Sequence, residues 1–326
     1  MDNSFNSRLR EWREVVRKLL LDADFDQAPP YLADPMRYAL QGEGKMIRPA
    51  LCLAAAEAVG GDWQESVQVA AALEIFHTFT LVHDDIMDGD ELRRGKPTVH
   101  KEFDDDRALL AGDTLLLYVY ELLGESDPQI FPLLYKAFTQ GAMDVCYGQG
   151  WDMQFGQSQS VDPEQYEMMI DLKTGALIKL ACEMGGIVGR GSEQQISALS
   201  RFGLLLGRAF QMQDDLLEVS SSADKMGKSL GSDVLNEKKT WIWLDLRANL
   251  SEAELQEWES IRASSELTPA ARDLVHQWMV NHGTVDRAEK LVQNWVNEAD
   301  QILNDSTFSD TSMLSALADL ILNRQN

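Results

Sequence analysis

Two short acidic strings hold the residues of this chain that are most capable of chemistry. The first runs Asp84-Asp85-Ile86-Met87-Asp88 and the second runs Asp214-Asp215-Leu216-Leu217-Glu218. On a helix, residues four apart share one face, so the first and last acids of each string should project together. Like charges at this spacing destabilise a helix by roughly 0.2–0.5 kcal/mol per pair, and a bound cation removes that penalty. Clusters that offer only oxygen favour Mg²⁺, which shares phosphate oxygens with its substrate.

One such string by itself is weak evidence. A chain this acidic can carry an Asp-Asp-x-x-Asp pattern by chance, and a solvated acidic helix end is the alternative interpretation. The context favours a metal, because both strings follow apolar segments, Phe76–Val82 and Leu204–Met212, where a solvated face is not expected. The sequence therefore predicts two carboxylate clusters that bind divalent cations.

Three basic clusters accompany the acidic strings, although the chain carries 53 acidic and only 29 basic residues. They are Gly42–Pro49, Leu92–Thr98, and Gly227–Asp233 followed by Lys238. The planar guanidinium of arginine matches phosphate oxygens, and glycine loops let backbone N–H groups approach them. For each cluster alone, an ion-pair network that ties loops to helices is the alternative. Together the three clusters predict a site for phosphorylated substrates.

Helices must position these clusters, because helical signals dominate the chain. Two long apolar segments, Ser66–Val82 and Ile196–Val219, lead into the acidic strings and predict central, buried helices. Strand patterns and hairpin turns are nearly absent. Ser251 and Glu254 have the spacing of a helix-capping box. With no internal repeat and no low-complexity linker, the prediction is a single all-α domain, a bundle of long helices over residues 1–326.

The composition argues against several classes of partner. A net charge of −24 repels phosphate backbones and anionic lipids, which disfavours nucleic-acid and membrane-surface binding. No apolar run approaches the ~18 residues that a membrane-spanning helix needs. Three scattered cysteines and an amino terminus without a signal-peptide pattern predict a cytoplasmic protein with reduced thiols.

The segment Glu74–Asp88, followed by Leu92–Thr98, closely resembles the trans-isoprenyl diphosphate synthases, the polyprenyl synthetase family. The likeness covers most of the chain, and its motifs keep the family's order and spacing. They are Gly44-Lys45 with Arg48-Pro49, Gly148-Gln149 with Asp152, Lys173–Ala176, Phe210–Asp215, and Gly227-Lys228 to Lys238. The resemblance implies the isoprenoid synthase fold, in which long helices surround a central active-site cavity.

The implied reaction joins isopentenyl diphosphate head to tail to an allylic diphosphate. The allylic C–O bond ionises, the double bond of isopentenyl diphosphate attacks the cation, and a proton passes to the departing diphosphate. No Ser-His or Cys-His arrangement marks a protein nucleophile, and this chemistry needs none. In this family the two acidic motifs hold three Mg²⁺ ions. The resemblance assigns Asp84, Asp88 and Asp214 as ligands, with Asp85, Asp215 and Glu218 in outer positions.

The resemblance also assigns the substrate contacts. Those of the allylic diphosphate are Arg93, Lys173, Lys228 and Lys238. Those of isopentenyl diphosphate are Lys45, Arg48, His77 and Arg94. Phe210 completes the substrate-binding set, and Thr174 and Gln211 would lie near the developing cation. The catalytic set is Lys173, Thr174, Gln211 and Lys228. His77 has an ordinary alternative, because a lone histidine on an apolar helix is often a core residue.

Two positions depart from the family pattern. Met46 stands where most relatives carry arginine, which removes one potential anion contact. The second acidic string ends in Glu218 instead of aspartate. Because the third metal of the family depends mainly on the first aspartate, we expect little loss from this change.

The resemblance implies that the growing chain runs beside the helix that leads to Asp84, so product length should depend on this helix. Phe79 and Phe76 lie five and eight residues before Asp84 along one wall, and the smaller Thr80 lies four before. This pattern resembles short-chain synthases and predicts a C20 geranylgeranyl product, with C15 farnesyl next. The alternative is that the two phenylalanines are ordinary core residues.

Three other functions stay open. A longer-chain polyprenyl diphosphate synthase would share these motifs. A terpene cyclase would share the first acidic string, but its second motif needs Ser or Thr four residues, and Glu eight residues, after the first acid, and this chain lacks them. A non-catalytic partner subunit usually loses an acidic string, whereas both are present. The family is generally homodimeric, so a homodimer is expected.

Overall fold

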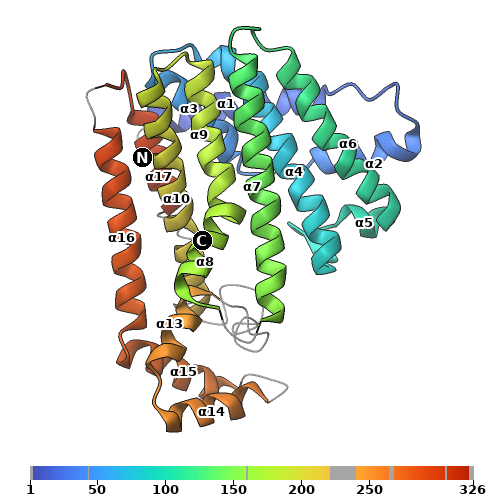
Figure 1. Cartoon of the computed structure of the whole chain (residues 1–326). Helices are drawn as coiled ribbons and strands as arrows, with labels where there is room; N and C mark the ends of the chain where they lie inside the picture. The colour runs from blue at the N-terminus through green and yellow to red at the C-terminus, as the bar shows by residue number, and fades with distance from the viewer. Residues whose placement is uncertain are drawn as a thin grey trace. The chain divides into compact units, whose positions relative to one another are not determined.

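The structure, a computed structural model, describes residues 3–42, 44–158, 161–220, 240–263, 268–304 and 307–322. Within these ranges the predicted all-α fold is confirmed (Figure 1). The helices are α1 (Asn3–Leu21), α2 (Pro30–Leu40), α3 (Ile47–Ala58), η1 (Trp63–Ser66), α4 (Val67–Asp88), α5 (Val99–Glu102), α6 (Asp105–Gly124), α7 (Phe131–Gln157), α8 (Pro163–Ile170), η2 (Asp171–Gly175), α9 (Ala176–Val188), α10 (Glu193–Ser220), α13 (Trp241–Asn249), α14 (Glu252–Arg262), α15 (Pro269–Asn281), α16 (Thr284–Leu303) and α17 (Ser312–Leu322). Of these, η1 is a 3₁₀ helix and η2 a π-helical turn. None of the described helices is long and apolar enough to cross a membrane.

The described residues fall into two compact units. Unit one draws them from Met1–Gln140, Leu177–Gly203 and Leu303–Asn323, and unit two from Gly141–Ala176 and Leu204–Ile302. The chain passes from one unit to the other inside α7, α10 and α16 and at the start of α9. The first acidic string belongs to unit one and the second to unit two. The single domain over residues 1–326 stays a prediction.

Helix α4, the first predicted buried helix, forms the centre of unit one. Every residue of its segment Val69–Phe76 is buried, and the helix packs along α3 and α6 (Figure 1). On α6, Gly112 permits a close approach, because a Cβ there would lie 2.3 Å from Nε2 of His83. Burial of one large apolar side chain contributes about 1.5–3 kcal/mol. The acidic end of α4 is therefore carried by a firmly packed helix.

Helix α10, the second predicted apolar helix, carries the second acidic string. Gly203 and Gly207, one turn apart on this helix, permit close packing at both positions. A Cβ at Gly203 would lie 2.7 Å from the Cα of Lys179, and one at Gly207 would lie 2.6 Å from the Cα of Gly175. Real side chains do not approach backbone this closely, so both contacts depend on glycine.

Capping side chains fix where helices of unit two begin. The predicted capping box at Ser251 and Glu254 is present at the start of α14. A second capping box, between Asp162 and Gln165, starts α8. Such caps stabilise a helix by about 1 kcal/mol. The start of α8 matters for the site, because this helix carries Tyr166.

A two-stranded hairpin follows α4, and the sequence patterns missed it. Strand β1 (Leu92–Arg93) pairs antiparallel with β2 (Lys96–Pro97). Both turn residues have positive φ, 54° at Arg94 and 78° at Gly95, as in the tight turns that hairpins favour. Two residues per strand are too few to show alternation, and Arg-Gly lacks the usual asparagine or aspartate of such turns.

Candidate active site

The three aspartates at the end of α4 have different environments. Asp85 is buried, with 3% of its surface exposed, whereas Asp84 is half-buried and Asp88 is exposed. Helix α4 continues through Asp88, so Asp84 and Asp88 lie one turn apart on one face, as predicted. Gly89 then ends the helix in the left-handed region, with φ of 68°. The string therefore keeps two carboxylates near solvent and withdraws the third.

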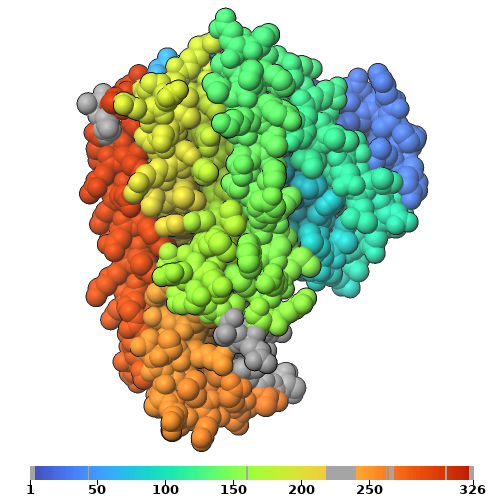
Figure 2. All heavy atoms as spheres, in the orientation of Figure 1, coloured from blue at the N-terminus to red at the C-terminus, as the bar shows by residue number. Residues whose placement is uncertain are grey.

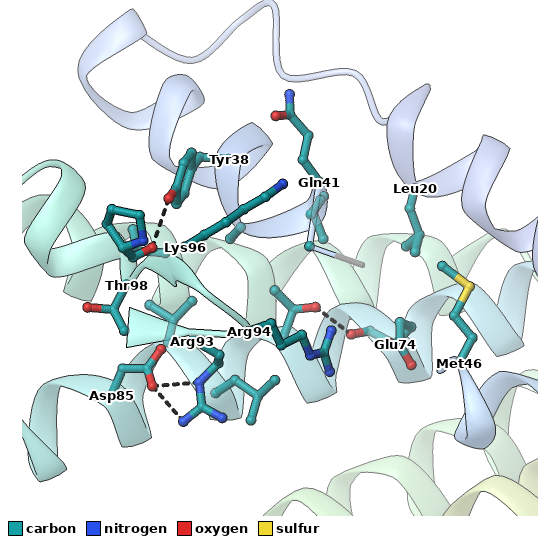
Figure 3. A pocket seen from close by; sticks show the side chains of 18 residues that line it. Leu20, Tyr38, Gln41, Met46, Glu74, Asp85, Arg93, Arg94, Lys96 and Thr98 are labelled. Atoms are coloured by element: carbon teal, nitrogen blue, oxygen red, sulfur yellow. Dashed lines mark hydrogen bonds and ion pairs between the residues drawn. The ribbon is translucent and has the colours of Figure 1, made fainter. Parts of the chain in front are cut away.

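Arg93 of the hairpin holds the buried carboxylate. Its Nε and Nη2 lie 2.6 Å and 2.5 Å from Oδ1 of Asp85 (Figure 3). Burial opposes the charged guanidinium, but the hydrogen bond and charge of Asp85, with the charges of Asp90 and Asp84, outweigh it and raise the pKa of Arg93. The side chain of Arg93 is 35% exposed. Its predicted contact with the allylic diphosphate would thus come from a guanidinium that already neutralises Asp85.

A cavity of about 170 Å³ lies between α2, α4 and the hairpin in unit one (Figure 3). Apolar side chains line much of it. The charged lining residues are Glu74, Asp85, Arg93, Arg94 and Lys96. The basic cluster predicted after the first acidic string therefore borders a cavity, together with two buried acids.

The glycine-containing loop before α3 approaches the same residues. A Cβ at Gly44 would lie 3.1 Å from both Oε1 of Glu74 and Nη1 of Arg94, so a side chain there would crowd both groups. Met46 has a left-handed φ of 47°, is 5% exposed and lines the cavity. The residue that departs from the family pattern thus presents an apolar side chain to the cavity. Lys45, beside it, is exposed.

Burial and three arginines set the pKa of His77. Burial lowers the pKa of His77 well below its usual value, and the positive charges of Arg48, Arg94 and Arg93 lower it further. The imidazole is therefore neutral at neutral pH. One turn earlier, burial raises the pKa of Glu74, and Arg48 and Arg94 oppose that rise. Three of the four predicted isopentenyl diphosphate contacts are thus electrostatic neighbours.

Aromatic rings cover the wall predicted to limit product length. Phe76 is fully buried and Phe79 is 8% exposed, and their ring centroids lie 5.6 Å apart. Phe76 meets Phe138 of α7 edge-on at 5.1 Å, and Phe79 meets His83 at 4.7 Å. The hydroxyl of Thr80 donates to the carbonyl of His77 at 2.8 Å. Phe79 is the more accessible of the two rings, so it is the better placed to contact a ligand.

In unit two, the second acidic string also withdraws its second aspartate. Asp215 is 6% exposed, whereas Asp214 is half-buried. Tyr166 of α8 donates from Oη to Oδ2 of Asp215 over 2.7 Å. Burial first, and then the charge and hydrogen bond of Asp215, raise the pKa of Tyr166 well above its usual value, so the phenol stays protonated as a donor.

Asp215 connects to two residues of the predicted catalytic set. Nε2 of Gln211 donates to Oδ1 of Asp215 at 3.1 Å. Oε1 of Gln211 in turn accepts from the hydroxyl of Thr174 at 2.9 Å. The structure therefore joins Thr174, Gln211 and the second acidic string by hydrogen bonds.

Thr174 and Lys173 lie in the π-helical turn η2. Such turns are rare and frequently mark functional sites. Two glycines permit close packing on either side: a Cβ at Gly148 would lie 2.2 Å from the backbone N of Lys173, and one at Gly207 would approach Gly175. Lys173 forms an ion pair with Asp152 of α7. The turn is thus fixed between α7 and α10.

An arginine of α10 also holds the start of η2. Nε and Nη2 of Arg208 each lie 2.6 Å from a carboxylate oxygen of Asp171, a bidentate geometry. The guanidinium also lies 5.9 Å from the ring centroid of Trp295. Bidentate pairs fix orientation as well as distance. Arg208 thereby ties the π-helical turn to the helix that carries Gln211 and Asp215.

Part of the predicted site lies outside the described residues. This applies to Lys228, Lys238 and the side chain of Glu218. Phe210 is described and is half-buried on α10.

Sequence reasoning missed several residues that position the site. Tyr166 contacts Asp215 across 49 positions of sequence, and no spacing rule signals such a contact. Arg208 and Glu74 gave no signal either. Asp152 was visible, because it belongs to the Gly148-Gln149 motif, but that motif did not identify Lys173 as its partner.

The donor set of the acidic strings suits Mg²⁺. The outward carboxylates supply hard oxygen ligands, the type that Mg²⁺ prefers. Within the described ranges, no group of three His, Cys, Asp or Glu side chains forms a preformed metal site. Mg²⁺ ordinarily keeps several waters and takes few protein ligands, so isolated carboxylates fit this ion.

Known proteins resemble this chain along most of its length. The family model for polyprenyl synthetase matches residues 29–275. The short chain isoprenyl diphosphate synthase of Methanothermobacter thermautotrophicus is 35% identical over 98% of both chains. The geranylgeranyl pyrophosphate synthase of Geoglobus acetivorans is 36% identical over 98% of both. The crystal structure of geranylgeranyl pyrophosphate synthetase from Pyrococcus horikoshii superposes with a TM-score of 0.89, at 31% identity and 99% coverage of each chain.

The helical architecture is the isoprenoid synthase fold, and the enzyme class is that of the prenyltransferases. Within that class, the chain belongs to the polyprenyl synthetase family.

Proposed function

We propose that this chain condenses isopentenyl diphosphate with an allylic diphosphate, head to tail, to give a short-chain trans-prenyl diphosphate. A C20 product is favoured, with C15 next. In the reaction the allylic C–O bond breaks, a new C–C bond forms to the double bond of isopentenyl diphosphate, and the departing diphosphate accepts the proton. The relatives named above, with their short-chain and geranylgeranyl products, support this choice.

Six acids would hold the Mg²⁺ ions. Three ions are expected when the diphosphate is bound. Asp84, Asp88 and Asp214 would act as ligands, and Asp85, Asp215 and Glu218 in outer positions. When bound, Mg²⁺ supplies positive charge at the diphosphate leaving group. The observation that carries the proposal is the shared pattern of burial: each string withdraws its second aspartate into hydrogen bonds and leaves its first half-buried at the helix end.

Side chains of unit two would act on the allylic substrate. Lys173 would bind its diphosphate beside Lys228 and Lys238, and Phe210 would contact its hydrocarbon. The oxygen of Thr174 would face the developing positive charge, because its hydroxyl hydrogen is already donated to Gln211. Oriented dipoles of this kind stabilise a charge at no further cost of reorganisation.

Residues of unit one would bind isopentenyl diphosphate. Arg48 and Arg94 would supply positive charge, and the neutral imidazole of His77, on which both charges act, would supply a donor. Lys45 would add an exposed cation. The apolar Met46 supports an anion site with one contact fewer than in most relatives.

Phe79 would limit the product at C20 by closing the space beside α4. Phe79→Ala should shift the products toward longer chains. A fitting control is Phe202→Ala, which removes a buried phenylalanine of unit one from a different helix. If both variants keep the wild-type product, Phe79 does not form this wall.

We also propose a homodimer. Helix α6 lies at the surface of unit one (Figure 2) and exposes Leu109, Leu110 and Leu117, the last of these 67% exposed. A second copy of the chain could cover this apolar face. Light scattering of the purified protein should give twice the chain mass, and Leu117→Glu should lower it. A wild-type monomer contradicts the proposal.

The product assay tests the function itself. Purified protein is incubated with Mg²⁺, isopentenyl diphosphate and each of dimethylallyl, geranyl and farnesyl diphosphate, and the products are separated by chain length. A C20 diphosphate is expected. A much longer product would identify a long-chain synthase, a cyclic hydrocarbon a terpene cyclase, and no product under any condition a non-catalytic subunit.

A further inference from the structure

We propose that Tyr166 is a positioning residue of the second acidic string, and that it acts through Asp215 and Gln211 to aim the oxygen of Thr174 at the reacting carbon. The inference rests on the proposed prenyl transfer, and it assigns a role to a residue outside the predicted site. All four residues belong to unit two.

Asp215 is a buried carboxylate. Only 6% of its surface is exposed, so its carboxylate must find donors within the protein. Tyr166 is 3% exposed and donates to Oδ2 at 2.7 Å, while Gln211 donates to Oδ1 at 3.1 Å. The phenol comes from α8 and the amide from α10, one turn before Asp215. Each carboxylate oxygen therefore has its own donor from a different element.

The chemistry of each group fixes the direction of the hydrogen bonds between Asp215, Gln211 and Thr174. An ionised carboxylate can only accept, so Gln211 must turn its NH₂ group toward Asp215. Its carbonyl then faces Thr174, and a carbonyl can only accept. Thr174 must consequently donate its one hydroxyl hydrogen at the 2.9 Å contact. The threonine oxygen then presents only its lone pairs, which attract positive charge and repel anions.

The phenol of Tyr166 is a neutral donor. Tyr166 holds Asp215 in place without adding positive charge, so it does not compete with a bound cation. A lysine or arginine in its place would hold the carboxylate equally well, but it would weaken the attraction of the string for Mg²⁺. Partners that orient a metal-binding carboxylate typically contribute about 10- to 100-fold in metal affinity or activity.

The experiment compares Tyr166→Phe with Tyr120→Phe, a matched control. Tyr120 also has a side-chain hydrogen-bond partner, Thr139 at 3.2 Å, but it belongs to unit one. For Tyr166→Phe, kcat should fall about 10- to 100-fold, while KM for isopentenyl diphosphate changes less than about two-fold because its site does not include Tyr166. The rise in thermal midpoint caused by MgCl₂ with inorganic pyrophosphate should also shrink. The control should match wild type in every measurement.

A double-mutant cycle tests the connection to Thr174. If Tyr166 acts through that hydroxyl, Tyr166→Phe should lower kcat less than about two-fold in a Thr174→Val background. Equal fold losses in both backgrounds, or a Tyr166→Phe variant with wild-type kcat and wild-type stabilisation by MgCl₂ and pyrophosphate, would overturn the inference. Should Tyr166→Phe not fold, Gln211→Leu breaks the same chain of hydrogen bonds and enters the same cycle. Failure of the proposed function would look different, because the wild-type protein would then form no prenyl diphosphate.

Discussion

Each of the two acidic strings buries one aspartate, and different side chains hold the buried carboxylate in each. In each, the second aspartate is buried and held by a side chain from a separate element. Among the contacts between described residues, Asp85 accepts from the cation of Arg93, whereas Asp215 accepts from the neutral donors Tyr166 and Gln211. A guanidinium cancels the charge of the carboxylate that it holds, and a phenol does not. Removing Arg93 and removing Tyr166 should therefore affect the two carboxylates differently.

The difference has a structural cause. Arg93 comes from a hairpin only five residues after α4 ends, so local sequence brings the cation to the carboxylate. Tyr166 comes from a helix 49 positions away and depends on the packing of α8, η2 and α10. We expect the first string to keep its geometry through local contacts and the second through the fold of unit two.

The largest expected effect is on turnover, in Asp84→Ala and Asp214→Ala. Each removes a proposed metal ligand, so kcat should fall by about 10³-fold or more, equivalent to about 4 kcal/mol of transition-state stabilisation. Thermal midpoints without Mg²⁺ should stay near wild type, because neither carboxylate is fully buried. Steady-state kinetics with excess Mg²⁺ measure the effect, and Asp113→Ala, an exposed aspartate on α6, is the control. Near-normal turnover in either variant would remove that residue from the metal site.

Much of the structure around the two acidic strings could be predicted from the sequence. The acidic strings, the two apolar helices that carry them and the capping box of Ser251 and Glu254 are all visible as local patterns, because helical periodicity and cap spacing are local. The partners of Asp85 and Asp215 are less visible. Arg93 was recognised as basic and near, but its pairing with Asp85 depends on a hairpin with two residues per strand. Tyr166 depends on tertiary packing alone, which no spacing in the sequence encodes.

The second effect is on stability, and it separates the two partners directly. Arg93→Met leaves Asp85 buried without its cation and should lower the free energy of unfolding by about 2–3 kcal/mol, less than a fully buried pair because Arg93 is 35% exposed. Tyr166→Phe removes a hydrogen bond from a neutral donor to the Asp215 carboxylate, which keeps Gln211 as a second donor, and should cost about 1.5 kcal/mol. Urea denaturation without Mg²⁺ measures both.

A second substitution checks the cause of that loss. Asp85→Asn in the Arg93→Met background removes the buried charge and should recover much of the stability. Equal costs for Arg93→Met and Tyr166→Phe, or no recovery in the double variant, would mean that charge does not distinguish the two strings.

The smallest effect concerns the arginines of unit one and depends on pH. Burial, with Arg48, Arg94 and Arg93, holds the pKa of His77 well below 6.5. Below pH 6.5 the unfolded chain therefore binds a proton that the folded chain does not, so His77 stabilises the fold above this pH and the stability is lost as pH falls. Between pH 7.5 and 5.5 the loss should be about 1 kcal/mol. The free energy of unfolding of His77→Gln should depend less on pH over this window, by that amount. His276→Gln, on α15 of unit two, is the control and should follow wild type. If His77→Gln also follows wild type, neither burial nor the neighbouring arginines lower the pKa of His77 in the folded chain.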